Sequence, residues 1–535
     1  MFNYLSKIIR YNKAKKTNIK EHNITAKRDI TLLSPDLKVN LEALRNILGT
    51  GEDIIMRTFS FGGNKQAKGA LIFVDGMVDK DVISSSVMKP LMYDTYIFAK
   101  KNASDTCNID IVYEELLSVS DVQKISTLDD LLDYLLSGST ILLVDGSKEA
   151  LVINAKKWER RSVEKPETEN VVRGPREGFT ENLRTNTTLL RRKIRNPDLR
   201  FETFTIGEKT RTDVSIAYIK DIVNPKLIHE IKKRLSNIQI DAVLESGYIE
   251  AFIEDAPYSI FSTVGNSEKP DTVAAKILEG RAAILVEGTP FVLTVPMLFI
   301  ESFQSAEDYY SRPFFASVIR IIRFLAYFIT ILAPAAYVAL STFHQELIPT
   351  LLLFTMTAGN EGVPFPSVVE ATIMIIIFEI LREAGVRLPR PIGSAVSIVG
   401  ALVIGESAVS AGLIGNFMVI IVALTAISSF AIPAQTDSGS ILRYFLLILA
   451  GVMGGFGIIM GLLVAFIHMV SLRSFGTPYL SPIAPFAPRD MKDTFIRMPL
   501  WTMTIRPRMI GRNNSRRQNS NPPSAPNNEE NDSQN

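Results

Sequence analysis

The sequence predicts an α/β N-terminal region of two related subdomains, followed by an α-helical polytopic membrane domain. Hydrophobic residues make up 47% of the 535 residues, and nearly all the long apolar runs lie after residue 313. Uncharged runs at 324–343, 407–436 and 444–467 each reach the roughly 20 residues that a membrane-spanning helix needs. The preceding region instead alternates short apolar strands with amphipathic helices.

The N-terminal region is expected to repeat one order of elements. A strand at 70–74 precedes a helix at 80–93, and the Asp145-Gly146 turn joins strands 140–144 and 149–154 in a hairpin. The same order returns about 140 residues later, where IAYI matches LIFV and AILVEG matches ILLVDG. We therefore expect two subdomains of one architecture.

Composition divides the chain into seven segments. A charged stretch with two prolines and little periodicity is expected to link the subdomains. The segments are a basic disordered arm (1–30), subdomain 1 (31–160), the linker (161–176), subdomain 2 (177–305), a transmembrane domain of about four to six segments (306–475), a basic cytoplasmic segment (476–511) and a disordered Asn/Ser/Pro tail (512–535).

Clustered positive charge marks both ends, although the formal net charge is only +2. Residues 1–28 hold eight Lys or Arg against one acid. This cluster suits an anionic membrane surface, or is solvated charge on a disordered arm, and nucleic acid is not an expected partner. The first residues lack the apolar core of a secretory signal, and the lone Cys107 permits no internal disulfide, as expected of a cytoplasmic region.

The distribution of arginine predicts how the membrane domain is oriented. Lys and Arg concentrate in cytoplasmic loops, so Arg320, Arg323 and the arginines of 382–390 are expected inside. The loop 434–440 has neither residue and is expected outside, whereas the tail after residue 472 is basic and is expected inside.

Four full crossings satisfy these positions, and five or six stay open. Residues 392–412 are expected to dip into the membrane without crossing, and 347–358 to be interfacial or re-entrant because they are too short to span. Tyr309 and Tyr310 are placed like interfacial anchors. Residues 490–501 can form a short helix on the membrane surface.

Acidic residues within the apolar region are the candidate ion pathway, because an ionisable group at membrane depth is costly without a role. The candidates are Glu361, Glu370 and Glu406. Glu370 has no adjacent cation, although an arginine from another helix would neutralise it. Glu379 stands at i,i+3 from Arg382, so these two are expected to form an intramembrane ion pair.

Small residues at every fourth position form a predicted helix-packing ridge. Its members are Gly393, Ser397, Ala401 and Gly405, and such ridges let helices approach closely. Glu406 follows the ridge directly and would form a carboxylate ring in a symmetric oligomer, as in cation channels, or be protonated and buried.

Signals for catalysis are poor. The four histidines are scattered, and no HExxH, CxxC, GxSxG or Walker pattern occurs. We expect no enzymatic activity, no cofactor and no metal site.

Several long stretches together resemble the A subunits of GerA-type spore germinant receptors. They include FVDGMVDKDVI, GPREGFTENLRTNTTLLRRKIRNPDL, SAEDYYSRP, EGVPFP and FEILREAGVRLPRPIGSAVSIVGALVIG. The resemblance implies a multi-pass protein of the spore inner membrane with both termini on the core side. It implies assembly with a transporter-like B subunit and a lipoprotein C subunit, and a homo-oligomer, possibly a pentamer, around an ion pore.

The expected function is therefore a membrane subunit that mediates nutrient-triggered germination as a nutrient-gated cation channel. SpoVAF, a close paralogue with the same architecture, makes an accessory germination channel an alternative, and a non-conducting scaffold is another. A solute transporter fits less well, because the membrane region shows no inverted repeat.

Overall fold

The computed structural model describes residues 31–517, apart from 50, 62–66, 95–108, 158–165, 167–168, 170, 389–399, 401–404 and 512–515. The basic arm, Cys107, half of the linker and nearly all of the Asn-rich tail therefore lie outside the described residues. The chain forms two compact units, one ending at Trp158 and the other containing 49–53 and everything after it.

The first unit is built on a five-stranded antiparallel sheet with order β1-β2-β4-β5-β3. Alternate side chains of each strand point to opposite faces, and both faces are covered. One face packs on α2 and α6, and the other on short α- and π-helical turns between β2 and β3. The elements are α2 (Leu37–Leu48), β1 (Ile54–Phe61), β2 (Ala67–Val74), α3 (Lys80–Val82), α5 (Ile109–Ile111), β3 (Val122–Ile125), α6 (Leu128–Leu136), β4 (Thr140–Val144) and β5 (Ala150–Ile153).

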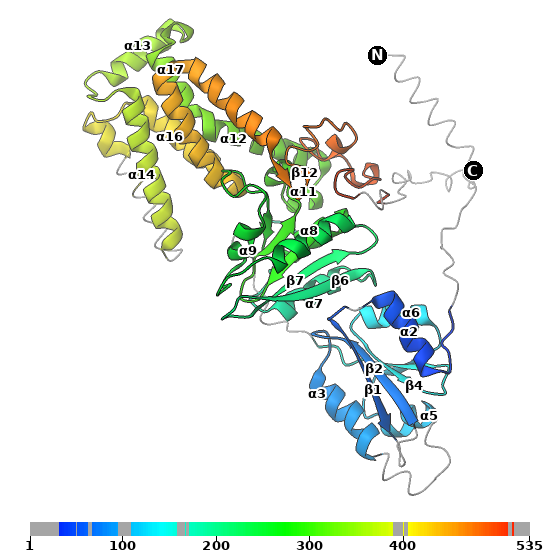
Figure 1. The fold of residues 1–535 in the computed structure, drawn as a ribbon. Coiled ribbons are helices and arrows are strands. Elements are labelled where there is room, and N and C mark those ends of the chain that lie inside the picture. Colours follow the sequence, from blue (N-terminus) through cyan, green and yellow to red (C-terminus); the bar gives the residue numbers. More distant parts are fainter. Residues whose placement is uncertain are drawn as a thin grey trace, which may run out of the picture. The chain divides into compact units, whose positions relative to one another are not determined.

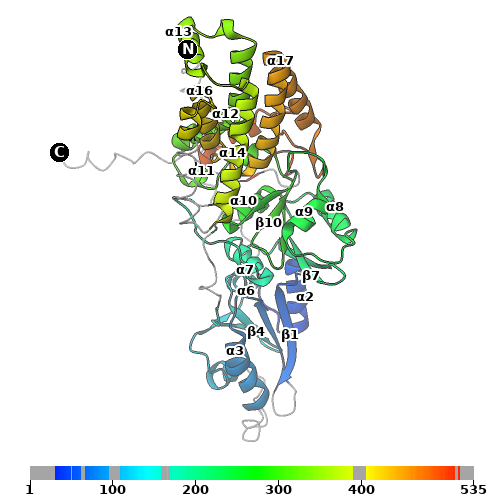
Figure 2. The ribbon, with the colours of Figure 1, turned by 90° about the vertical axis from the view of Figure 1, so that its left-hand side faces the viewer.

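The second unit begins with a sheet of the same strand order, β6-β7-β9-β10-β8. Helices α8 and α9 cover one face, while α7 and α10 cover the other (Figures 1 and 2). The elements are α7 (Leu183–Lys193), β6 (Leu199–Ile206), β7 (Thr212–Ile219), α8 (Pro225–Ser236), α9 (Ser246–Ile253), β8 (Gly265–Ser267), α10 (Pro270–Glu279), β9 (Ala282–Val286) and β10 (Val292–Val295). The shared order agrees with the repeat expected from the sequence.

Local expectations in these sheets are confirmed with one adjustment. Strands β4 and β5 pair from Thr140–Ile153 to Leu143–Ala150, and Gly146 has the positive φ of 89° that their turn requires. The helix expected at 80–93 is instead α3 followed by π-helical turns as far as Asp94.

The rest of the second unit is mainly helical. Two helical segments, Pro313–Thr342 and Pro433–Ser471, are long and apolar enough to cross a membrane by length and composition. The helices are α11 (Glu307–Tyr310), α12 (Pro313–Thr342), α13 (Thr350–Asn360), α14 (Ser367–Arg387), α16 (Asn416–Ser429) and α17 (Thr436–Ser471).

Helix α17 reverses direction at Gly454, whose φ of 60° and ψ of −141° are not helical. A methyl group built on Gly461 would lie 2.6 Å from the Leu446 side chain, whereas 15 residues of straight helix would separate these positions by about 22 Å. The two arms therefore form a hairpin (Figure 1). The expectation of one helix through 444–467 is wrong, because glycine permits a sharp turn inside an apolar run.

The loop 434–440 was expected at the end of the helices farthest from Arg320, but it lies at the end nearest the second sheet. Gln435 Nε2 donates a hydrogen bond of 2.8 Å to Ser302 Oγ, next to the second sheet. Gly415, which starts α16, lies instead beside Glu370 at the start of α14. The run 407–436 is thus not one helix, since Gly412 has a φ of 64° and α16 covers only its middle.

The C-terminal segment folds against the second sheet. Met297 N donates to Ser474 Oγ at 2.9 Å, and Phe299 N donates to Tyr479 O at 2.9 Å. Strands β11 (Arg473–Ser474) and β12 (Thr477–Pro478) pair, and only single 3₁₀ turns follow at Asp490–Lys492 and Leu500–Thr502. The expected helix at 490–501 is therefore wrong, because these residues make their contacts with the folded unit.

Replacing Gly454 with alanine should destabilise the helical region. The new side chain would take an unfavourable positive φ, and its Cβ would lie 2.8 Å from Phe343 Cβ. Gly362→Ala is the matched control, because Gly362 also has a positive φ but no atom within 4 Å. We expect a larger fall in thermal midpoint for Gly454→Ala, measured in detergent. Equal falls would contradict the close contact at the turn.

Candidate functional site

Glu370 is buried inside the helical bundle, with 2% of its surface exposed. It lies in the first turn of α14, and its Oε2 accepts a hydrogen bond of 3.0 Å from Gly415 N, the N-cap of α16. Helix N-termini carry partial positive charge. The N-termini of α14 and α16 both compensate the charge of the Glu370 carboxylate. The absence of an adjacent cation in the sequence therefore has a structural explanation.

Two further oxygens lie near Glu370. Tyr337 of α12 has Asn360 and Glu370 as neighbours, and a methyl group built on Gly415 would lie 2.1 Å from Asn360 Oδ1. The Tyr337 hydroxyl and Asn360 Oδ1 are both buried, and among the described residues neither atom forms a hydrogen bond of ordinary geometry. These side chains thus form a polar cluster among apolar helices, and sequence reasoning missed both Tyr337 and Asn360.

The other two candidate acids are exposed. Glu361 follows the last residue of α13, and Glu406 lies in a short helical turn at 405–410. Among the described residues, neither forms a hydrogen bond or ion pair with Glu370, which does not face the surface. The structure therefore separates the three candidates into one internal group and two surface groups.

The expected pair of Glu379 and Arg382 is present, with 2.7 Å between Oε2 and Nη2. A second arginine, Arg443 of α17, also pairs with Glu379 and is only 1% exposed. Sequence reasoning missed Arg443 because its partner is distant in the chain. The sequence did contain a signal for this pair, because Arg443 directly precedes the uncharged run 444–467 and a charged residue beside such a run needs a partner.

The predicted packing ridge lies mostly outside the described residues. Gly393, Ser397 and Ala401 are not described, while Gly405 is buried and faces Val419 of α16. Gly451 approaches α14 closely, because a methyl group there would lie 2.6 Å from Val368. Contact of the ridge with a second subunit stays a prediction.

A buried ion network joins the start of α12 to the C-terminal segment. Arg320 is 0% exposed, with Asp308 at 2.8 Å and Asp493 at 2.7 Å. Tyr309 donates its hydroxyl hydrogen to Asp493, and Tyr310 donates to Asp271. Burial raises the pKa of the Tyr309 hydroxyl well above its ordinary value. Both tyrosines therefore serve as hydrogen-bond donors within the second unit, and their expected position as interfacial anchors stays a prediction.

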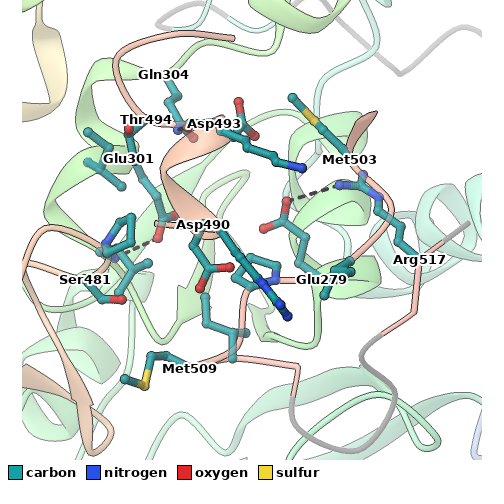
Figure 3. Close-up of a pocket in the computed structure, with 18 of the residues that line it drawn as sticks. Glu279, Glu301, Gln304, Ser481, Asp490, Asp493, Thr494, Met503, Met509 and Arg517 are labelled. Carbon is teal, nitrogen blue, oxygen red and sulfur yellow. Dashed lines mark hydrogen bonds and ion pairs between the residues drawn. The ribbon is translucent and has the colours of Figure 1, made fainter. Parts of the chain in front are cut away.

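Beside this network lies a cavity of about 210 Å³ between α10, the residues after β10 and the C-terminal segment (Figure 3). Glu279, Glu301, Asp490 and Asp493 line it together with Arg281 and Arg517, so its wall carries both signs of charge. Burial raises the pKa of Glu279. Among the described residues, no group of three His, Cys, Asp or Glu could hold a metal ion.

Comparisons with known proteins agree with one another. The family model "Bacillus/Clostridium GerA spore germination protein" matches residues 42–509. Spore germination protein KA of Bacillus subtilis (strain 168) is 47% identical over 91% of this chain and 89% of that protein. The membrane protein YfkQ of the same organism is 45% identical over 91% of this chain and 93% of that protein. Stage V sporulation protein AF is more distant, at 32% identity over 77% of this chain and 84% of that protein.

One solved structure is also similar. The N-terminal domain of the A subunit of the Bacillus megaterium spore germinant receptor GerK3 is 37% identical, covers 51% of this chain and 99% of that chain, and gives a TM-score of 0.41. The family match spans most of the sequence, and the similarity to protein KA covers nearly the whole chain. The chain belongs to the GerA family of spore germination proteins.

Proposed function

We propose that the chain is the A subunit of a spore germinant receptor, embedded in the spore inner membrane, where it gates monovalent cations when a nutrient binds the complex. The observation that carries this proposal is the enclosure of Glu370, Glu379 and Arg443 within apolar helices. Ionisable groups persist at such depth where they serve a pathway or hold its geometry. The higher identity to protein KA than to stage V sporulation protein AF favours a receptor subunit over an accessory channel.

The chain path favours six membrane passes. Helix α12 and the first arm of α17 run away from the second sheet. Helices α14 and α16 and the second arm of α17 run toward it. The end of α14 and the start of α16 lie at opposite ends of the bundle, which makes the total number of passes even. An even number keeps both termini on one side, which we propose is the spore core.

In this proposal, copies of the chain assemble into a ring, such as a pentamer, beside a transporter-like B subunit and a lipoprotein C subunit. Glu406 and Glu361 are exposed on the single chain and are therefore available to line a path between copies. Glu370 is internal, so it acts by positioning α14 against α16. Rings of carboxylates concentrate cations.

A non-conducting scaffold is the second candidate, and one observation favours it. Glu370 and Glu379 are both compensated inside the chain, so neither needs an ion to explain its presence. Single-channel recording of the purified receptor, with and without nutrient, separates the two functions. A channel shows nutrient-dependent unitary currents, whereas a scaffold shows none.

Neutralising the exposed acids should reduce cation selectivity. Glu406→Gln and Glu361→Gln keep side-chain size but remove the charge of a ring, so we expect lower cation-over-anion permeability in recordings of the reconstituted receptor. Glu370→Gln should affect gating or yield more than selectivity, because that carboxylate is compensated internally. Unchanged selectivity in both exposed-site variants would exclude the ring.

Glu379→Gln should lower the yield of folded protein. It leaves Arg382 and Arg443 without their carboxylate, and removing one member of a buried pair costs about 3–5 kcal/mol. Glu383→Gln is the matched control, because Glu383 lies on the same helix and is 62% exposed. The measurement is monodisperse yield from size-exclusion chromatography, and equal yields would contradict the structural role of Glu379.

Cysteine labelling tests the orientation in a Cys107→Ser background. Asn186 is 0% exposed and would be unreactive from either side, so Tyr258, which is fully exposed beside α9, is the reporter for the second subdomain. Glu346, at the far end of α12, has a 71% exposed side chain. An impermeant maleimide applied to intact cells should label Glu346→Cys and leave Tyr258→Cys unlabelled until lysis. The reverse pattern would invert the proposed orientation.

A further inference from the structure

The cluster around Glu379 contains more positive than negative charge. Arg382 Nη2 lies 2.7 Å from Glu379 Oε2, and Arg443 pairs with Oε1 of the same carboxylate. The Ser440 hydroxyl also donates to Oε1, at 3.0 Å. Two guanidinium groups and one carboxylate leave one positive charge uncompensated.

The nitrogen atoms of this cluster are not all satisfied. Arg443 is only 1% exposed, yet in the part of the chain that the structure describes its Nε has no hydrogen-bond partner, and neither does the buried Nη1 of Arg382. A buried cation without full pairing costs several kcal/mol in an apolar setting. These atoms therefore point to a further acceptor that the described residues do not supply.

Nearby charges do not remove the excess. Glu383 pairs with Arg387 at 2.6 Å, so these two neutralise each other on the exposed side of α14. Glu406 is exposed, and among the described residues no ion pair links it to Arg382 or Arg443. The excess positive charge thus stays with Arg382 and Arg443.

An apolar cavity of about 320 Å³ adjoins the cluster, between α14 and α16. Among the lining residues that the structure describes, Arg382 is the charged one, and the others apart from Gly405 have apolar side chains. The walls that matter here are formed by Met374, Phe378, Val419, Ala426 and Ile427. A cavity with apolar walls and one cation at its edge suits a ligand with an alkyl chain and an anionic head.

We propose that this cavity binds an anionic amphiphile, whose alkyl chain lies between α14 and α16 and whose headgroup lies at Arg382 and Arg443. Arg382 and Arg443 lie toward the end of the helices nearest the second sheet, since Ser440 and Gln435 lie there. Basic pockets between membrane helices on the cytoplasmic side are suited to acidic lipid headgroups. The inference rests on the membrane location in the proposed function.

Native mass spectrometry of the full chain, purified in detergent, tests this site with three probes. Phosphatidylglycerol and oleate share an anionic head and an alkyl chain, whereas phosphatidylcholine has the chains without the net charge. We expect both anionic probes to bind more tightly than phosphatidylcholine. The tighter of the two identifies a phospholipid or a fatty acid as the better fit.

Three variants locate the binding. Arg382→Gln should weaken phosphatidylglycerol binding about fivefold, and it leaves Glu379 paired with Arg443, so the fold should persist. Arg387→Gln is the matched control, because it removes the same charge from the same helix at a 77% exposed position. Ala426→Phe should weaken binding of both anionic probes by filling the cavity while keeping every charge.

Equal binding by Arg382→Gln and Arg387→Gln would overturn the proposal, as would equal affinity for phosphatidylcholine and phosphatidylglycerol. Unchanged binding by Ala426→Phe would also overturn it, because the chain would then lie outside the cavity. Loss of oligomer mass in Arg382→Gln without loss of lipid would instead assign the acceptor to a second copy. Flotation of the unmodified chain with vesicles tests the membrane location separately, since it does not depend on Arg382.

Discussion

The ion pairs of Arg320 connect the sheet-containing part of the second unit to its helices. This arginine belongs to α12, Asp308 lies just before that helix, and Asp493 lies in the C-terminal segment. A fully buried guanidinium is stable only where its partners hold it from several sides. The start of α12, the preceding turn and the chain's return from α17 are therefore fixed by one charge, and the position of the remaining helices depends on them.

The ionisable groups deeper among the helices also need partners for their charge, but Glu370 and Glu379 find them in different ways. Glu370 is compensated by helix N-termini and the Gly415 amide, whereas Glu379 is compensated by two arginines. The first arrangement balances its charge with dipoles and fixes where α16 begins. The second arrangement places two arginines against one carboxylate, so it leaves an excess of positive charge, and it joins α14 to the first arm of α17. Compensation of charge therefore also sets the packing of the helices.

Local features of the fold were predictable, because short-range periodicity and turn chemistry determine them. The hairpin at Asp145-Gly146 and the recurrence of its order in the second sheet both follow from neighbouring residues. The reversal at Gly454 was not predictable, because an apolar run that contains glycines is equally compatible with one helix or with two. The arginine-poor loop at Gln435 misled for another reason: its contact with Ser302 depends on tertiary structure.

The site residues likewise divide into those that local sequence predicts and those that depend on tertiary contacts. The pairing of Glu379 with Arg382 follows from one helical turn, but Arg443 lies 64 residues after Glu379 in the chain, and Asn360 belongs to another helix. This difference bears on how cations would be attracted. A carboxylate draws mobile ions only with charge that its own chain has not already balanced. Glu370 and Glu379 are balanced in place, so in the proposed channel the attraction of cations would fall to exposed acids such as Glu406, while the internal acids hold α14 against α16 and α17.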